Sequence, residues 1–161
     1  ARQLWLCSTD SPAPAGPPAT LDAWLWGEVR SGVATLSAAV VEAFVPQMLN
    51  YESVGGVNFK KGCYPGQEVV ARSQFRGTLK RRTYLAHSPV ALKVGDPVFS
   101  PTDPEQPAGT VVQAAVAPQG GFDALVSLQV AAVEGGTLHL EGVQGPALTL
   151  LELPYALLED I

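Results

Sequence analysis

Cys63 lies in a segment whose residue types favour a reactive thiol, KKGCYPGQE over residues 60–68. Lys60 and Lys61 precede the cysteine, and a helix is predicted to begin at Gly66 or Gln67. Nearby positive charge and a helix N-terminus both favour the thiolate form of a cysteine. The segment therefore predicts a reactive or ligand-contacting thiol. An inert, buried cysteine in a glycine-rich turn is the alternative that these residues leave open.

The other cysteine and the two histidines give no comparable signal. Cys7, His87 and His139 form no paired-ligand spacing such as CxxC, so no resident metal is expected. Cys7 falls in a predicted strand over residues 3–8 and is expected in the core. Each histidine is expected to be a partly exposed strand residue rather than a catalytic base. The sequence contains neither a Gly-x-Ser-x-Gly elbow nor a Walker-type phosphate loop.

A basic segment surrounds the cysteine motif in an otherwise acidic chain. The formal net charge is −5, whereas residues 60–82 carry seven bases and one acid, a net +6. A local field of one sign attracts a ligand of the opposite charge, here a phosphate, a carboxylate tail or an RNA backbone. The alternative is a solvated face whose bases pair with acids elsewhere in the fold. The acidic total argues against a general nucleic-acid-binding protein, so direct nucleic-acid binding is not expected.

Composition places the chain among globular proteins of about one domain. It has 161 residues, of which 47% are hydrophobic and 16% charged, and this is too apolar for intrinsic disorder. No apolar run approaches the roughly 18 residues that suggest a membrane span, so no membrane partner is expected. Two cysteines cannot form a disulfide scaffold, and no leader is recognised, so a cytoplasmic location is expected. The chain opens at Ala1 in what reads as mid-strand, which suggests a fragment or a processed chain.

The first part of the chain is predicted to mix helices with short strands. A proline-rich loop over residues 10–19 precedes a helix over residues 21–31, with Thr20 as its N-cap and Gly32 as its stop. Residues at helical spacing predict one largely apolar face on this helix: Leu21, Trp24, Leu25, Glu28 and Val29. A short strand is expected over residues 33–36. A second helix is expected from residue 66 or 67 to about residue 77.

From residue 78 onward the pattern changes to six short strands. They are predicted over residues 78–87, 98–100, 110–117, 122–131, 137–140 and 147–153, with glycines and prolines between them. Short strands at close spacing, separated by such turns, are typical of a small antiparallel barrel or sandwich. The sequence therefore predicts an α+β piece up to about residue 76, followed by an all-β piece.

The segment Lys61 to Glu68, KGCYPGQE, resembles the K-G-C-Y-x-G-Q-E signature of the YgfZ family. These are folate-binding proteins related to the aminomethyltransferase of glycine cleavage. Neighbouring stretches also agree, at residues 44–47, 49–50, 55–60, 70–72, 75–77 and 80–81. The similarity is dense over about residues 24–84 and loose through the predicted barrel, and the tail at residues 153–155 agrees again.

The resemblance implies a fold, a cofactor and partners. Residues 1–76 would be part of a ferredoxin-like folate-binding middle domain and residues 77–161 the C-terminal β-barrel, so the chain would be the second half of a longer protein. The family uses tetrahydrofolate and supports the upkeep of iron–sulfur enzymes, including those that thiolate transfer RNA. Cys63 would be its functional, or catalytic, residue. The other motif positions would bind folate or a partner, and here they are Lys61, Gly62, Tyr64, Gly66, Gln67, Glu68 and Arg72.

Two other functions stay open beside this one. The first is a folate-dependent aminomethyltransferase, but those relatives carry an acid in a Leu-Glu-Ala-Gly segment where this chain has Arg30. The second is an RNA- or partner-binding module that uses the basic segment over residues 60–82. Because no ligand set for a resident cluster is expected, Cys63 would contact a cluster, a partner's thiol or a folate-borne one-carbon unit transiently. The sequence does not choose among these three.

Overall fold

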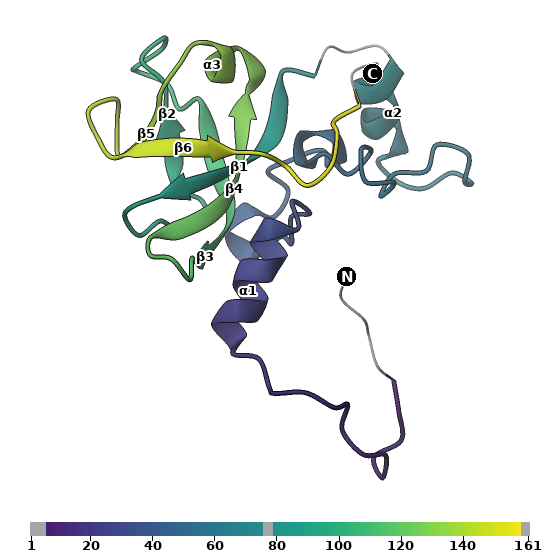
Figure 1. Cartoon of the computed structure of the whole chain (residues 1–161). Coiled ribbons are helices and arrows are strands. Elements are labelled where there is room, and N and C mark those ends of the chain that lie inside the picture. The colour runs from purple at the N-terminus through teal and green to yellow at the C-terminus, as the bar shows by residue number, and fades with distance from the viewer. Residues whose placement is uncertain (1–5, 76–78, 159–161) are drawn as a thin grey trace.

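The described part of the chain consists of a β-barrel preceded by short helices (Figure 1). The computed structural model describes residues 6–75 and 79–158. Ahead of the strands come α1 (Leu21–Arg30), η1 (Ala38–Val40), η2 (Pro46–Leu49) and α2 (Gln67–Phe75), where η marks a 3₁₀ helix. The strands are β1 (Arg81–Ser88), β2 (Pro97–Phe99), β3 (Gly109–Val116), β4 (Phe122–Gln129), β5 (Leu138–Leu140) and β6 (Ala147–Leu151). The short helix α3 (Val130–Glu134) joins β4 to β5.

The strands form one closed antiparallel barrel in the order β1-β4-β3-β2-β5-β6. β1 pairs with β4 along its whole length, from Arg81 opposite Gln129 to Ser88 opposite Phe122. Its other edge pairs with β6, which closes the barrel. In the closed barrel each strand has a neighbour on both sides, although the ladder between β2 and β3 covers only Pro97–Val98 and Gly109–Thr110. The predicted small antiparallel barrel is therefore confirmed.

The predicted element boundaries need several corrections. Residues 130–131 begin α3 rather than extending β4, and residues 152–153 lie beyond the end of β6. Residues 33–36 form no strand, and residues 6–8 of the predicted first strand are irregular. Residues 3–5 of that strand, the predicted helix end near residue 77 and the predicted strand start at residue 78 fall outside the described residues.

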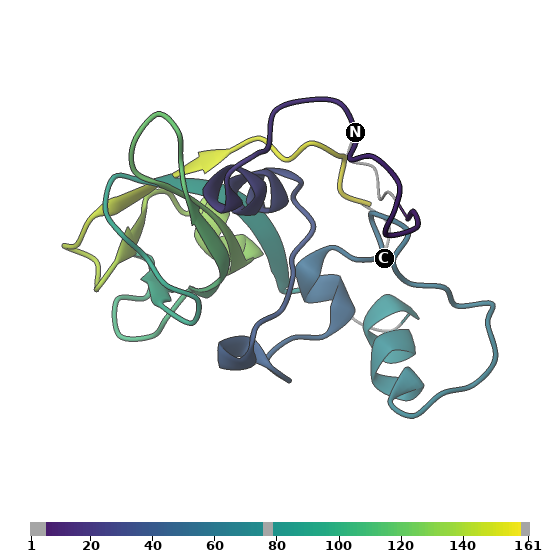
Figure 2. The ribbon, with the colours of Figure 1, turned by 90° about the horizontal axis from the view of Figure 1, so that it is seen from below.

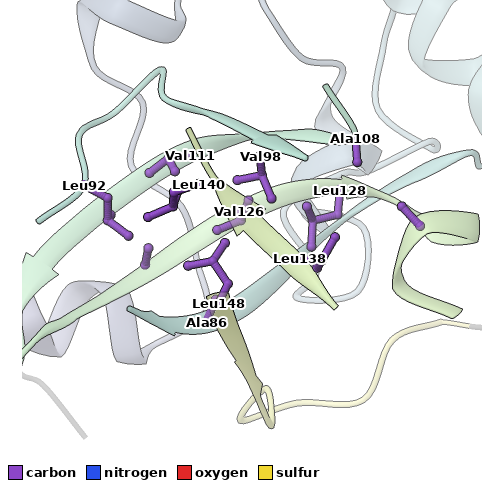
Figure 3. Packing of buried hydrophobic residues seen from close by; sticks show 12 residues of the cluster. Ala86, Leu92, Val98, Ala108, Val111, Val126, Leu128, Leu138, Leu140 and Leu148 are labelled. Carbon is purple, nitrogen blue, oxygen red and sulfur yellow. The ribbon is translucent and has the colours of Figure 1, made fainter. Parts of the chain in front are cut away.

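Two clusters of buried side chains hold the fold together. The first fills the barrel (Figure 3), with inward-facing residues such as Ala86 and Val126. The second lies on the outer side of the barrel, where Leu85 and Leu125 meet Val29 of α1. Successive strand residues point to opposite faces of a sheet, so β1 and β4 can contribute to both clusters. The segments before β1 thus share a core with the barrel.

Helix α1 begins and ends as predicted, but Val29 is the one buried residue of its predicted apolar face. The Thr20 hydroxyl caps it by accepting a hydrogen bond from the amide of Ala23 at 3.2 Å, and Gly32 follows its end with φ of +71°. Val29 is fully buried, whereas most of the predicted apolar face is exposed: Leu21 by 70%, Trp24 by 52% and Leu25 by 41%. Periodicity therefore included the residue that packs on the barrel, but it predicted a wider apolar stripe than the one that is buried.

Cys7 is exposed, so the prediction that it belongs to the core is wrong. The prediction rested on a strand over residues 3–8, and the described part of that segment carries no strand. Leu6 beside it is 86% exposed. Without a partner strand, an alternating apolar pattern has no face to bury.

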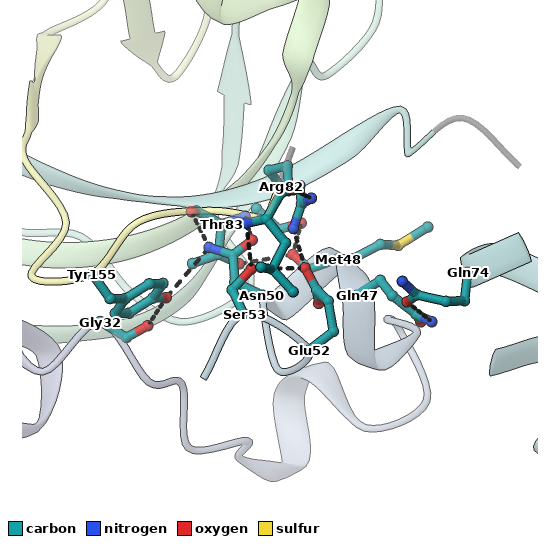
Figure 4. Close-up of polar contacts among 12 residues, drawn as sticks. Gly32, Gln47, Met48, Asn50, Glu52, Ser53, Gln74, Arg82, Thr83 and Tyr155 are labelled. Atoms are coloured by element: carbon teal, nitrogen blue, oxygen red, sulfur yellow. Dashed lines mark hydrogen bonds and ion pairs between the residues drawn. The ribbon is translucent and has the colours of Figure 1, made fainter. Parts of the chain in front are cut away.

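Helix η2 is bonded to the barrel by buried polar groups (Figure 4). The Asn50 amide group donates to the carbonyl of Thr83 at 2.7 Å and accepts from the Thr83 amide at 3.2 Å. The Thr83 hydroxyl donates to the carbonyl of Met48 at 2.9 Å. Glu52, just beyond η2, forms a buried ion pair with Arg82 of β1. Buried polar groups need partners of this kind, and here they fix η2 on β1.

Helix α2 is attached through η2 and lies on the far side of it from the barrel (Figure 2). The fully buried Gln47 of η2 donates through Nε2 to the carbonyl of Val70 at 2.7 Å. Val70 is the buried residue of α2. A chain of contacts therefore runs from β1 through η2 to the helix that follows the cysteine motif.

Three tyrosines are expected to make the fold sensitive to alkali. Burial raises the pKa of Tyr51, Tyr84 and Tyr155 above the usual value of 10.0. The folded protein then holds these protons more tightly than the unfolded chain. The stabilisation that these protonated tyrosines provide is therefore fully present below the tyrosine pKa of the unfolded chain. It is lost as the pH rises through the higher pKa values of the folded protein. We expect the urea midpoint to fall above about pH 10, and tyrosinate absorbance to rise later in the folded than in the denatured protein. Identical titration of the two states would contradict this.

Candidate functional site

The cysteine motif forms an exposed loop that leads into α2. The Asn58 side chain accepts a hydrogen bond from the amide of Lys60 at 2.8 Å and shapes the turn before the motif. Gly66, with φ of +82°, turns the chain into the helix, and the carbonyl of Tyr64 accepts from the amide of Gln67 at 3.2 Å. A positive φ suits glycine because it has no Cβ. The loop arches outward past α2, away from the barrel (Figure 1).

Cys63 is exposed within this loop, so the alternative of a buried cysteine is wrong, while the reactivity of the thiol stays a prediction. Gly62 before it and Pro65 after it are also exposed. Across residues 6–75 and 79–158, the Cys63 side chain makes no hydrogen bond within the chain. A thiol in this position is open to a molecule that approaches from solvent.

Aromatic contacts brace the loop on both sides of the cysteine. The Lys61 ammonium lies over the Tyr64 ring, 4.4 Å from its centroid, which is within cation–π range. The Phe59 ring meets the Phe75 ring of α2 edge to face, with centroids 5.3 Å apart. The Phe59–Phe75 contact ties the residues before the motif to the end of α2, and the Lys61–Tyr64 contact lies within the loop.

The face of α2 carries a groove of about 410 Å³, lined by Glu68, Ala71, Arg72 and Phe75. Arg72 and Glu68, one helical turn apart, form an exposed ion pair. Phe75 is 70% exposed, which is unusual for so large an apolar side chain. The groove thus offers a guanidinium, a carboxylate and an aromatic surface to a ligand.

The structure brings the predicted site residues together in two groups. Glu68 and Arg72 share the groove on α2, while Lys61 and Tyr64 stack in the loop. The other predicted positions belong to the same continuous segment and are exposed or half-buried: Gly62, Cys63, Gly66 and Gln67. No hydrogen bond or ring contact in the described ranges joins Cys63 to the groove.

The basic segment over residues 60–82 is not one free cationic patch. Arg82 is buried against Glu52, and Arg72 pairs with Glu68. Arg81 donates to the carbonyl of Ala108 at 3.4 Å. Arg76 falls outside the described residues. Because Arg82 is buried in its ion pair, the bases of the segment do not all face one ligand, and the RNA- or partner-binding alternative stays a prediction.

A second polar cluster, between α1 and the barrel, was not predicted from the sequence. Asp123 accepts a hydrogen bond from Trp26 Nε1 at 2.8 Å, and His87 Nδ1 lies 2.9 Å from its other carboxylate oxygen. Arg30 approaches the same carboxylate at 3.7 Å. His87 is a partly exposed strand residue, as predicted, but its bond to Asp123 was not foreseen. Local spacing gives no signal for partners so far apart along the chain.

No family model matches the chain. The function is therefore inferred from the two sites described above. Among the described residues, no three Cys, His, Asp or Glu side chains gather as a metal site would require. No helix within residues 6–75 and 79–158 is long and apolar enough to cross a bilayer.

Proposed function

We propose that this chain belongs to a tetrahydrofolate-binding accessory protein that supports the assembly or repair of iron–sulfur enzymes, with Cys63 as its functional thiol. The observation that carries the proposal is the exposed Cys63 within the KGCYPGQE loop. The resemblance of that loop to the YgfZ signature supplies the cofactor and the partner class. In this proposal residues 1–76 belong to a ferredoxin-like folate-binding domain of which this chain holds only part.

The groove on α2 has the chemistry to hold part of a folate. A guanidinium pairs well with a carboxylate, so Arg72 would exchange its exposed ion pair with Glu68 for the glutamate tail. The exposed Phe75 ring would stack on an aromatic ring of the ligand, and Glu68 would accept its N–H groups. Tetrahydrofolate carries one-carbon units, and that is the chemistry it would supply when bound.

The loop would present Cys63 to a second molecule while α2 holds the folate. The thiol is exposed, and the stacked Lys61 and Tyr64 stiffen the loop beside it. The contact between Gln47 and Val70 anchors α2, so the loop ends on a fixed support. In this arrangement Cys63 makes transient contact with a partner's cluster or thiol, or with a one-carbon unit on the folate.

Calorimetric titration of tetrahydrofolate into the intact gene product tests the folate part of the proposal. We expect saturable one-to-one binding. Arg72→Gln is expected to weaken it roughly tenfold or more, because a hydrogen bond to a charged group contributes about 1.5–3 kcal/mol. The matched control is Lys93→Gln, which removes one exposed positive charge far along the chain from the motif. Absence of binding by folded protein would refute the folate assignment, and equal losses in both variants would refute the role of Arg72.

A further inference from the structure

A second cavity, of about 440 Å³, opens between α1 and the barrel. Its walls come from four parts of the chain, namely α1, β1, the β3–β4 turn with the start of β4, and β6. The residues that matter for its chemistry are Trp26, Arg30, His87, Gln119, Asp123 and Leu151. Its volume falls within the range of small-molecule sites.

Asp123 organises the polar wall of this cavity. Its side chain is only 7% exposed, and one oxygen accepts from Trp26 Nε1 at 2.8 Å while the other meets His87 Nδ1 at 2.9 Å. Arg30 lies 3.7 Å from the first oxygen. Because a carboxylate only accepts hydrogen bonds, His87 carries its proton on Nδ1 in this arrangement. The carboxylate is thus occupied by its own neighbours and sets their orientation.

The groups left facing the cavity favour a negatively charged ligand. The side chains of Arg30 and His87 are 41% and 36% exposed. Within the described ranges, His87 Nε2 makes no hydrogen bond. The Arg30 guanidinium lies over the Trp26 ring, 6.0 Å from its centroid, which holds it at the mouth of the cavity. Leu151 and the Trp26 ring add apolar surface.

We propose that this cavity binds a small organic anion, with its carboxylate or phosphate group on Arg30 and His87. The planar guanidinium suits either group, since it pairs with both in bidentate fashion. His87 Nε2 accepts a ligand hydroxyl when the ring is neutral and donates to the anion when it is protonated. The apolar body of the ligand rests on Leu151 and Trp26. This site uses none of the residues of the cysteine motif and does not depend on the function proposed above.

The test follows the Trp26 indole N–H signal of the ¹⁵N-labelled intact protein by NMR, assigned with Trp26→Phe. The probes are phenylacetate, phenyl phosphate and the neutral phenylacetamide. We expect saturable shifts with at least one anion, at a Kd of about 1 mM or tighter, and none with the amide. Saturation by phenylacetate assigns a carboxylate site, and saturation by phenyl phosphate alone assigns a phosphate site.

Two variants test the binding residues without disturbing the fold. Arg30→Gln is expected to weaken anion binding roughly tenfold or more. His87→Asn keeps a donor where Nδ1 lies, so the bond to Asp123 can persist, but it removes Nε2 and is expected to weaken binding while the fold stays intact. Lys93→Gln is the charge control and should bind like the unaltered protein. The proposal is overturned if neither anion shifts the signal, if phenylacetamide binds as well as they do, or if Arg30→Gln has no more effect than Lys93→Gln.

Discussion

Arg82→Met is expected to lower the free energy of unfolding by about 3–5 kcal/mol, because it leaves a buried carboxylate without its counter-charge. The Arg82 and Glu52 side chains are 9% and 2% exposed and form an ion pair at the junction of η2 and β1. The Ser53 hydroxyl donates to Glu52 Oε1 at 2.9 Å, but within the described residues Oε2 has no hydrogen-bond partner and the counter-charge comes from Arg82. The variant also loses the hydrogen bond from Arg82 to the carbonyl of Leu158, at 2.8 Å. Urea unfolding followed by circular dichroism measures the change.

The double variant Glu52→Gln with Arg82→Met distinguishes a lost charge partner from lost packing. Removing both charges takes away the uncompensated carboxylate, so the double variant should be more stable than Arg82→Met by itself. The four proteins form a double-mutant cycle, and its coupling energy isolates the pair. Additive losses, with no recovery in the double variant, would contradict an electrostatic origin.

The barrel could be predicted because its signals are local. Apolar strands alternate with glycine and proline turns, and each turn marks a strand end within a few residues. The two ends of α1 could also be predicted, since Thr20 and Gly32 act through atoms within one turn of the helix. How much of its apolar face is buried could not be predicted from the spacing. Leu21 and Trp24 have the right spacing and yet face solvent, because the barrel lies on the side of Val29.

Of the two candidate sites, the one made of neighbouring residues could be predicted and the one made of distant residues could not. Cys63 could be found because its motif is continuous in sequence, and the exposed loop follows from the glycines and proline around it. The cluster around Asp123 could not be found, because Trp26 and His87 lie 97 and 36 residues away from it along the chain. The pairing of β1 with β4 sets His87 opposite Asp123, and the packing of α1 on the barrel brings Trp26 to the same carboxylate.

Cys63→Ala is expected to abolish the proposed support of iron–sulfur enzymes while leaving stability nearly unchanged. The side chain is exposed, and in the described part of the chain it makes no hydrogen bond whose loss would matter. Surface substitutions of this kind change the free energy of unfolding by no more than about 0.5 kcal/mol. The thiol, by contrast, is the reactive group that the proposal assigns to the motif. The measurement is the activity of an iron–sulfur enzyme that thiolates transfer RNA, in cells whose copy of this gene is replaced by the variant.

Cys7→Ala is the matched control, because Cys7 is also an exposed cysteine and lies outside the motif. It should support the enzyme as well as the unaltered protein does.

Tetrahydrofolate titration of the Cys63→Ala protein adds a second readout. Retained folate binding with lost enzyme support would assign the thiol to the partner step, whereas loss of both would assign it to the folate site. Full enzyme support by Cys63→Ala would refute the functional thiol. Cys63 lies between Lys61 and Tyr64 just before α2, whereas Cys7 lies outside the motif. Equal losses of enzyme support in Cys7→Ala and Cys63→Ala would therefore contradict a special role of the motif cysteine.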